Sequence, residues 1–323
     1  MNETGKVTTK MAICYDFDKT LSQDDMQCFE FIPSIGMNAT EFWKENNNFS
    51  IKNSIDRVLS YMYTMLKKAN EVKLPITKDK FMSFGKTIKL YNGVEEWFDL
   101  INKFGEQNGV KIEHYIISSG LKEIIQGSSV APKFKKIYAS SFYFDDNGNA
   151  VWPAQAINYT TKTQFIYRIA KGVLEEWDES VNEPMDNIPR DTPYENIVYI
   201  GDSDTDIPCM RLVNSKGGNS IGVYDPTTQN RDKVLKLLNE KRVNFYAPAD
   251  YSENGTLMEI LKKIIIKVSA QAQLSAETFS QMPSANLYHE YILLKKAFNE
   301  NGGQLSKKEL EILQAYEKQI EKK

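Results

Sequence analysis

Two carboxylates and a hydroxyl follow the first apolar run of the chain: Asp16, Asp18 and Thr20 come directly after Met11–Tyr15. Successive strand residues point to opposite faces, so Asp16 and Asp18 leave the strand end on the same side. Carboxylates that close repel each other unless a cation lies between them or one holds a proton. A metal-bound nucleophile beside a proton donor satisfies both conditions. The alternative is a strand that runs into an acidic turn, because Asp favours turns.

Two more apolar runs also end in polar clusters. Ile112–Ile117 is followed by Ser118–Gly120, and Ile197–Ile200 is followed by Gly201 and then Asp202 and Asp206. In an open parallel sheet, ligands bind at the carboxyl ends of the strands, where the strand order reverses. Right-handed crossovers bring these ends to one edge of the sheet. We therefore expect residues far apart in the chain to converge on one crevice.

Each of these side chains has a chemical task in phosphoryl transfer. Asp16, Asp202 and Asp206 offer the hard oxygen ligands that suit Mg²⁺. With part of a phosphate's charge neutralised, the Asp16 carboxylate can attack phosphorus and form an aspartyl phosphate. Asp18 would then protonate the leaving oxygen and later deprotonate the hydrolytic water.

Phosphate binding is assigned to the remaining polar groups of the three strand ends and to one lysine. Ser118, the backbone amides of Ser119 and Gly120, and the Lys162 ammonium would hold the transferring oxygens. Thr20 completes this phosphate-binding set. Taken alone, Lys162 would be read as a solvated helix lysine and Ser118 as a turn serine; their order along the chain favours the phosphate site.

The combination resembles the four motifs of the haloacid-dehalogenase-like phosphohydrolases, and within them the phosphoserine-phosphatase-like branch. Asp16–Thr20 is similar to motif one, Ile116–Gly120 to motif two, Lys162 before an amphipathic helix to motif three, and Tyr199–Asp206 to motif four. The sequence departs from the branch at Ser119 and Ser203, where glycine is usual. Both changes add a hydroxyl near the phosphate or the metal.

The resemblance implies roles for individual residues. Asp16 would be the nucleophile and Asp18 the general acid and base. Mg²⁺ would be coordinated by Asp16, the Asp18 backbone carbonyl and Asp202, with Asp206 in the supporting shell. In phosphoserine phosphatases a cap acid binds the substrate amine and a cap arginine binds its carboxylate. Asp25 falls near the position of that acid, and Arg57 is a candidate for the arginine.

The element pattern predicts an α/β fold, a Rossmann-like, doubly wound and mostly parallel sheet. Residues 10–24 and 90–267 would form this discontinuous catalytic core. The helical stretch 25–89 is too long for a simple crossover and is predicted to be an inserted module. It resembles the small helical cap of the family, which implies that it closes over the crevice. Residues 268–323 would form a C-terminal helical extension.

Local patterns inside these regions give further expectations. Ser50 is expected to cap a long cap helix that begins at Ile51. The extension should contain a separate helix over Glu277–Asn299, then a helix opened by a capping box of Ser306 and Glu309. The segment Asp178–Glu195, rich in Asp, Asn, Glu and Pro, is typical of a surface loop.

Composition limits the class of protein. The 323 residues are 41% hydrophobic and 26% charged, which is ordinary for a globular chain. A net charge of -3 disfavours a nucleic-acid surface. Three widely spaced cysteines indicate reduced thiols in a cytoplasmic protein. Neither a secretory signal in residues 1–10 nor a membrane span is expected, because the late apolar run at Ile260–Val268 is short and interrupted by lysines.

Only two histidines are present, too few for a histidine metal cage. His114 lies in a strand-like run and is expected to pack in the interior with a hydrogen bond.

The function that these features favour is Mg²⁺-dependent hydrolysis of a small phosphorylated metabolite, with a phosphoserine-like substrate as one option. Phosphotransfer to an acceptor other than water stays open, because the first half-reaction is the same. A non-catalytic phosphate-binding protein is the alternative from another class. The helices after Val268 would then be its working surface, or would otherwise form a homo-oligomer or brace the cap.

Overall fold

The computed structural model describes residues 9–184, 191–300 and 303–320. The described chain divides into two compact units, one holding the residues up to 268 and the other those from 269 on. The N-terminal residues 1–8, where no secretory signal is expected, lie outside the described residues. So does part of the predicted loop Asp178–Glu195, whose described ends contain the 3-10 turns Glu179–Asn182 and Tyr194–Asn196.

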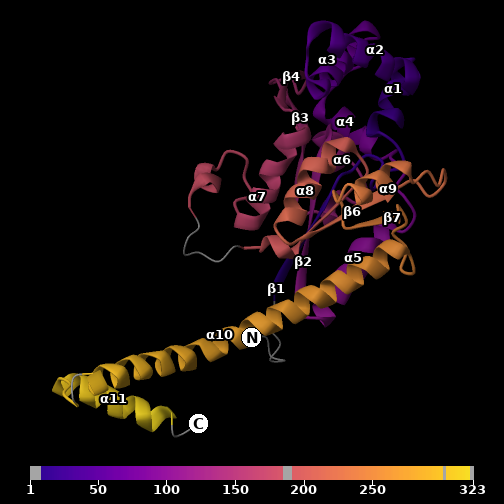
Figure 1. The fold of residues 1–323 in the computed structure, drawn as a ribbon. Helices are drawn as coiled ribbons and strands as arrows, with labels where there is room; N and C mark the ends of the chain where they lie inside the picture. Colours follow the sequence, from indigo (N-terminus) through magenta and orange to yellow (C-terminus); the bar gives the residue numbers. More distant parts are fainter. Residues whose placement is uncertain (1–8, 185–190, 301–302, 321–323) are drawn as a thin grey trace. The chain divides into compact units, whose positions relative to one another are not determined.

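The first unit is built on a seven-stranded sheet with the strand order β4-β3-β2-β1-β5-β6-β7 (Figure 1). The antiparallel pair is β3 with β4, and the other neighbours are parallel. Because β1 pairs with both β2 and β5, the strand order reverses beside β1. The predicted doubly wound, mostly parallel sheet is confirmed. The strands are β1 (Thr9–Tyr15), β2 (Val110–Leu121), β3 (Lys136–Phe144), β4 (Ala150–Gln155), β5 (Ile197–Gly201), β6 (Asn219–Tyr224) and β7 (Phe245–Pro248).

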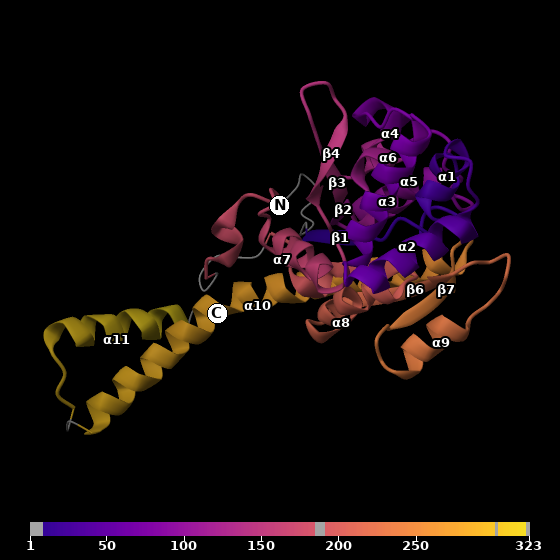
Figure 2. The same ribbon diagram turned by 90° about the horizontal axis from the view of Figure 1, so that it is seen from above.

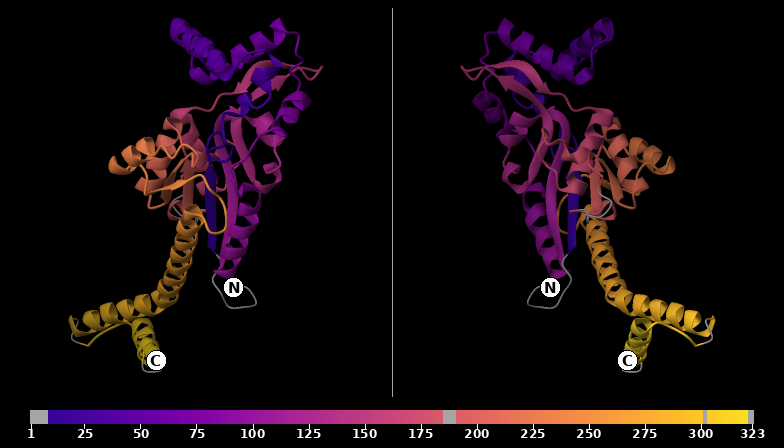
Figure 3. Two further views of the ribbon diagram at one scale, coloured as in Figure 1. Left: turned by 90° about the vertical axis from the view of Figure 1, so that its right-hand side faces the viewer. Right: turned by 90° about the vertical axis from the view of Figure 1, so that its left-hand side faces the viewer.

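Helices cover both faces of this sheet because its strands are apolar on both sides. In β1, Met11, Ile13 and Tyr15 belong to one buried cluster, and Ala12 and Cys14 belong to another. The first cluster includes side chains from α5 (Val94–Gln107) and from the first turns of α10 (Thr256–Glu300). The second includes α7 (Thr163–Lys171), α8 (Ile207–Ser215) and α9 (Asp232–Asn239). Figures 2 and 3 show α5 and α8 on opposite sides of the sheet.

Between β1 and α5 the chain forms the helical segment predicted as a cap, which lies beyond the carboxyl end of β1 (Figure 3). Its helices are α1 (Phe31–Ser34), α2 (Ala39–Asn53), α3 (Arg57–Glu71) and α4 (Lys78–Gly85).

One predicted helix start in the cap is wrong. Ser50 lies inside α2, and its hydroxyl donates to the Ile55 carbonyl. The next helix begins instead at Arg57, because the Asp56 carboxylate accepts hydrogen bonds from the amides of Val58 and Leu59. Ile51, expected as the first residue of that helix, lies instead near the end of α2 and is 74% exposed.

Two glycines bring cap helix α4 into backbone contact with α6 (Lys122–Gln126) of the core. A Cβ on Gly127 would lie 1.8 Å from the Met82 carbonyl oxygen, and one on Gly85 would lie 2.1 Å from that of Ile124. Neither position leaves room for a side chain, so this end of the cap is tightly joined to the core.

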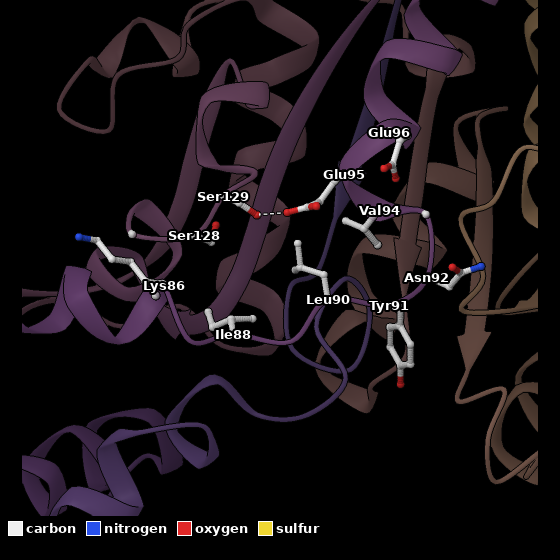
Figure 4. Close-up of a pocket in the computed structure, with 13 residues that line it drawn as sticks. Lys86, Ile88, Leu90, Tyr91, Asn92, Val94, Glu95, Glu96, Ser128 and Ser129 are labelled. Carbon is white, nitrogen blue, oxygen red and sulfur yellow. Dashed lines mark hydrogen bonds between the residues drawn. The ribbon is translucent and has the colours of Figure 1, made fainter.

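A cavity of about 600 Å³ lies where the cap chain returns to the core, lined by residues 85–96 and 127–129 (Figure 4). Ser129 donates a hydrogen bond to Glu95 at its wall. None of the predicted site residues lines it.

The second unit contains the part of α10 from Ser269 on and the whole of α11 (Lys307–Ile320). The stretch Glu277–Asn299 is helical, as predicted, but it is not a helix of its own, because α10 is continuous from Thr256 to Glu300. Alanine and glutamine residues, which favour helix, fill the stretch that joins the two parts. The predicted capping box is confirmed: Ser306 and Glu309 exchange hydrogen bonds at the start of α11.

Six large apolar side chains of α10 in this second unit are exposed to solvent. They are Leu274, Phe279, Met282, Tyr288, Ile292 and Leu293. Among the described helices, none combines the length and the apolar character needed to cross a bilayer.

Candidate active site

Asp16 and Asp202 lie on either side of the point where the strand order reverses. Asp16 follows β1 and Asp202 follows β5, and the register pairs Tyr15 of β1 with Ile200 of β5. The Asp16 amide donates to the Ile200 carbonyl at 2.9 Å. The hydrogen bonds between β1 and β5 therefore continue as far as Asp16, the predicted nucleophile. This switch point is where open α/β sheets bind ligands.

The loop after β1 turns sharply and fixes Asp18. The amides of Leu21 and Ser22 both donate to the Phe17 carbonyl, and Lys19 has a left-handed backbone with φ 56°. The Met26 amide donates to Asp18 Oδ1 at 2.8 Å. Asp18 is therefore held at the mouth of the crevice between the core and the first turn of the cap segment.

Lys162 is fully buried and lies against two carboxylates. Its Nζ atom is 3.2 Å from Asp16 Oδ1 and 2.7 Å from Asp206 Oδ1. The 3-10 turn Tyr159–Lys162, opened by a capping box between Asn158 and Thr161, places this lysine just before α7. The other interpretation of Lys162, a solvated lysine on a helix surface, does not fit because its side chain has no exposed surface.

Hydrogen bonds occupy both carboxylate oxygens of Asp206. Oδ1 accepts from Lys162 and from the Tyr199 hydroxyl at 2.7 Å, and Oδ2 accepts from the amide and the hydroxyl of Ser203. A carboxylate bound in this way holds Lys162 in place. It has less capacity left for a metal ion than Asp16 or Asp202.

Ser118 and Gly120 lie in the irregular last turn of β2, where its register with β3 shifts between Ser118 and Leu121. The Ser118 hydroxyl accepts a hydrogen bond from the Gly120 amide. A Cβ on Gly120 would lie 2.9 Å from Asp18 Oδ2 and 2.1 Å from the Met26 methyl carbon, so a side chain here would displace the ends of both of these side chains. The Tyr61 hydroxyl of cap helix α3 donates to the Ser119 carbonyl at 2.7 Å. The cap thus contacts the predicted phosphate-binding loop directly.

The remaining predicted phosphate ligand, Thr20, is buried, and its hydroxyl donates to Asp202 Oδ1 at 3.4 Å. The structure therefore gathers Asp16, Asp18, Ser118, Ser119, Gly120 and Asp202 around one crevice of about 340 Å³. Lys162 and Asp206 lie behind Asp16, and Thr20 lies beside Asp202.

Burial and mutual repulsion raise the proton affinity of the carboxylates that lack full hydrogen bonding. Burial, with the nearby Asp206 charge, raises the pKa of Asp16 to about 6 although the Lys162 ammonium opposes it. Burial and the charges of Asp206 and Asp16 raise the pKa of Asp202 to about 8. Burial, with Asp25 and Asp16, also raises the pKa of Asp18.

The Lys162–Asp206 pair behaves in the opposite way. Burial alone would lower the pKa of Lys162, but the charges of Asp16 and Asp206 raise it above its usual value. Burial alone would raise the pKa of Asp206, but the Lys162 ammonium and the hydrogen bonds from Lys162, Tyr199 and Ser203 hold it below its usual value. Both groups are therefore charged.

The residues present fit a divalent cation. Asp16, Asp202 and Asp206 each offer a carboxylate oxygen, and these atoms lie within 4.8 Å of one another. Asp16 Oδ1 is buried and, despite its distance of 3.2 Å from Lys162, accepts no hydrogen bond from a described residue. Oxygen donors of this kind suit Mg²⁺. Asp16 and Asp202 are the natural ligands, because Asp206 is already committed to Lys162 and its other donors.

The two predicted substrate residues have different surroundings. Asp25 lies at the crevice, but its carboxylate is 2.8 Å from the Lys19 ammonium. Arg57, at the start of α3, is exposed and lines the edge of a cavity beneath the cap. Both residues line the cavity beneath the cap, Asp25 where that cavity joins the crevice and Arg57 at its exposed rim, but the contact with Lys19 leaves Asp25 less free to bind an amine.

Several residues at the site were missed by the sequence analysis. Tyr199 holds Asp206, Tyr61 contacts the Ser119 carbonyl, and Asn158 donates to the Asp56 carboxylate of the cap at 3.1 Å. Tyr199 could have been found from its place two residues inside the strand that delivers Asp202. The other contacts depend on how the cap packs and leave no local signal.

Comparison with known proteins identifies the fold. No protein-family model matches the chain. An uncharacterized protein of Borreliella burgdorferi is 28% identical over 298 residues, which cover 83% of this chain and 100% of that protein. A probable phosphoserine phosphatase from Vibrio cholerae superposes with a TM-score of 0.52 at 12% identity, over 82% of this chain and 68% of that one.

A further solved structure, a HAD-family hydrolase from Salmonella enterica serovar Typhi, gives a TM-score of 0.49 at 15% identity over 75% of this chain and 68% of that one. The match to the Vibrio cholerae protein shows that this chain shares the fold of that probable phosphoserine phosphatase. At these identities the likeness concerns the fold, and the activity has to be argued from the site.

Proposed function

We propose that the protein is a Mg²⁺-dependent phosphomonoesterase that acts on a small phosphorylated metabolite through an aspartyl phosphate on Asp16. The observation that supports this most strongly is the buried Lys162 ammonium, 3.2 Å from Asp16 Oδ1 and at the same switch point as Asp202. A buried cation beside a buried carboxylate suits a site that receives an anion. The matching fold of known phosphatases adds to this argument.

In the first step Asp16 attacks phosphorus, and the bond from phosphorus to the leaving oxygen breaks. Asp18, whose raised pKa lets it keep a proton, gives that proton to the leaving oxygen. In the second step water attacks phosphorus and loses a proton to Asp18. The acyl phosphate bond breaks, Asp16 is released as a carboxylate, and inorganic phosphate leaves.

Lys162, Ser118 and the backbone amides of Ser119 and Gly120 would hold the phosphoryl oxygens during both steps. Thr20, bonded to Asp202, would orient that carboxylate or a phosphoryl oxygen. Asp206 positions Lys162 and does not touch the reacting atoms. When bound by Asp16 and Asp202, Mg²⁺ supplies positive charge that offsets both the phosphate and the repulsion between the carboxylates.

The proposal is tested by hydrolysis of p-nitrophenyl phosphate with Mg²⁺ and after removal of Mg²⁺ by a chelator. We expect turnover that requires the metal and disappears in Asp16→Asn and Asp202→Asn. A matched control is Asp204→Asn in the same loop, where the side chain is 75% exposed and should be dispensable. Metal-independent turnover, or an Asp16→Asn variant of full activity, would refute the proposal.

The same assay separates the two alternatives. If an added alcohol is converted to its phosphate ester in preference to hydrolysis, the protein is a phosphotransferase. If the protein binds inorganic phosphate but no ester is cleaved, it is a non-catalytic phosphate-binding protein.

A further inference from the structure

A cavity of about 220 Å³ lies beneath the cap and continues from the catalytic crevice. The two spaces share Asp18, Asp25, Ser119, Gly120 and Thr205. Because Asp18 protonates the leaving oxygen in the proposed function, the leaving group must lie on the Asp18 side of the phosphoryl group, which is this cavity. The walls of the cavity therefore indicate the chemistry of the leaving group, an inference that rests on the proposed function.

The deep walls of the cavity are polar but uncharged. Gln27 and Asn46 are each 2% exposed, and Asn158 is 9% exposed. Trp43, Val58 and Tyr61 of the cap add an aromatic and aliphatic wall. An aromatic wall with a few fixed polar groups is the usual composition of a site for a small ligand.

The amides in this wall have hydrogen-bonding capacity that the protein leaves unused. Ser60 donates to Asn46 Oδ1 at 2.6 Å, which fixes the amide, while the Asn46 NH₂ group donates to no described residue. Gln27 Oε1 and the Ser119 hydroxyl are buried and lack a partner among the described residues. A buried polar atom without a partner is costly, and at a binding site the ligand can supply the missing partner.

Charged groups around the cavity are either occupied or peripheral. Asp25 is paired with Lys19 at 2.8 Å, so an incoming ammonium group would have to compete with that lysine. Asp56, next to the cavity, accepts from two amides of α3 and from Asn158. Arg57 is exposed at the rim. The cavity therefore offers no free carboxylate apart from the catalytic Asp18 to a zwitterionic amino acid.

We propose that the leaving group is an uncharged, hydroxylated molecule, so that the substrate is the monophosphate of a short polyol or a monosaccharide. Hydroxyl groups both donate and accept hydrogen bonds, so a hydroxylated molecule can offer an acceptor to the Asn46 NH₂ group and a donor to Gln27 Oε1. The carbon face of such a molecule packs against Trp43. A cavity of about 220 Å³ is below the ~300 Å³ at which sites for drug-sized ligands begin, which favours a leaving group of a few carbons.

The first experiment compares substrates at saturating Mg²⁺. Glycerol 3-phosphate and glucose 6-phosphate are tested against O-phosphoserine and phosphoethanolamine, with p-nitrophenyl phosphate as the common reference. We expect kcat/KM for the better hydroxylated substrate to exceed that for both amine-bearing substrates by about tenfold or more. If either amine-bearing substrate is preferred, or all four are equal, the inference is overturned.

The second experiment uses Gln27→Met, which removes the unpaired amide and keeps the length of the side chain. The ratio of kcat/KM for the hydroxylated substrate to that for p-nitrophenyl phosphate should fall about tenfold or more. The midpoint of thermal unfolding should rise, because a buried polar atom without a partner is lost. A purely structural glutamine would instead give a lower midpoint and an unchanged ratio, which would overturn the assignment.

Gln281→Met, at an exposed position of α10, is the matched control and should change neither quantity. Turnover of p-nitrophenyl phosphate distinguishes a failure of the leaving-group inference from a failure of the proposed function. If the wild-type protein cleaves it in a metal-dependent way but does not prefer hydroxylated substrates, only the inference about the leaving group fails. If no ester is cleaved at all, the proposed function fails, and this inference fails with it.

Discussion

The Nζ atom of Lys162 lies 2.7 Å from Oδ1 of Asp206, and neither side chain is exposed to solvent. This pair places a cation beside Asp16, whose Oδ1 lies 3.2 Å from the lysine Nζ. Because Tyr199 and Ser203 satisfy the rest of the Asp206 carboxylate, the lysine has one favoured position. The catalytic centre therefore depends on an ion pair that does not itself react.

Loss of this lysine should be costly to stability as well as to activity. In Lys162→Met, Asp206 stays buried without its cation, and we expect the free energy of unfolding to fall by about 3–5 kcal/mol. The double variant Lys162→Met/Asp206→Asn should recover part of this loss, because the unpaired charge is gone. Urea unfolding of both variants measures the difference.

The control for this measurement is Lys236→Met on α9, where the side chain is exposed and the change should stay within about 0.5 kcal/mol. If Lys162→Met is as stable as the control, the buried ion pair does not carry the role assigned to it.

Asp18→Asn should separate the two half-reactions. p-Nitrophenolate is a good leaving group and needs little help from an acid, whereas water still needs a base. We expect a rapid release of about one equivalent of nitrophenolate, then turnover slowed by about 10²–10⁴-fold. The mass of the quenched protein should increase by one phosphoryl group. The double variant Asp16→Asn/Asp18→Asn should show neither signal. A slow reaction without an initial burst would argue against the aspartyl phosphate.

His114 should make the protein less stable in acid. It is buried, its Nε2 donates to Asn102 Oδ1, and its Nδ1 accepts from the Tyr15 hydroxyl, as expected for a packed and hydrogen-bonded residue. Burial lowers its pKa from 6.5 to about 3. Between these values the unfolded chain binds a proton that the folded chain does not bind. This contribution to stability is complete above about pH 6.5 and is lost as the pH falls towards 3.

The expected slope from this one group is about 1.4 kcal/mol per pH unit inside that range. The difference in unfolding free energy between the wild-type protein and His114→Gln, measured from pH 7 to about pH 4, isolates it from the carboxylates. The other histidine, His289, is exposed on α10, so His289→Gln is a matched control. Parallel pH curves for the wild-type protein and His114→Gln would contradict this account.

Gly127→Ala should loosen the junction between the cap and the core. The added Cβ would lie 1.8 Å from the Met82 carbonyl oxygen, so the backbones of α4 and α6 must separate. We expect a loss of about 1–3 kcal/mol in unfolding free energy. Gly148→Asn is the comparison, because that glycine has open space around it and a left-handed backbone that Asn tolerates. Equal stability of the two variants would mean that the close contact is unimportant.

A homo-oligomer through the C-terminal helices stays a prediction. Phe279 and Leu274 of α10 are 79% and 64% exposed, more than most large apolar side chains of a folded chain. If these residues form the contact, Phe279→Lys and Leu274→Lys should lower the mass measured by light scattering to that of one chain. Gln281→Lys should leave the mass unchanged. If the wild-type protein is already monomeric, the prediction of a homo-oligomer is wrong.

The sequence by itself determined the sheet and the residues at its active edge. Apolar runs ending in Asp16, Ser118 and Asp202 could be read locally, and general rules of parallel sheets then predicted that they converge. The same reasoning led to Lys162, because its order along the chain was informative even though its side chain looked unremarkable.

Only the tertiary structure decided which groups remain free. Asp56 and not Ser50 caps α3, Asp206 is committed to Lys162, and Asp25 is paired with Lys19. In each case several hydrogen-bonding or charged groups are brought together by packing, and the local sequence does not show which of them pair. The amide-lined wall of the cavity under the cap arises in the same way, because Asn46 lines the same cavity as Asp18 only when the cap folds onto the core.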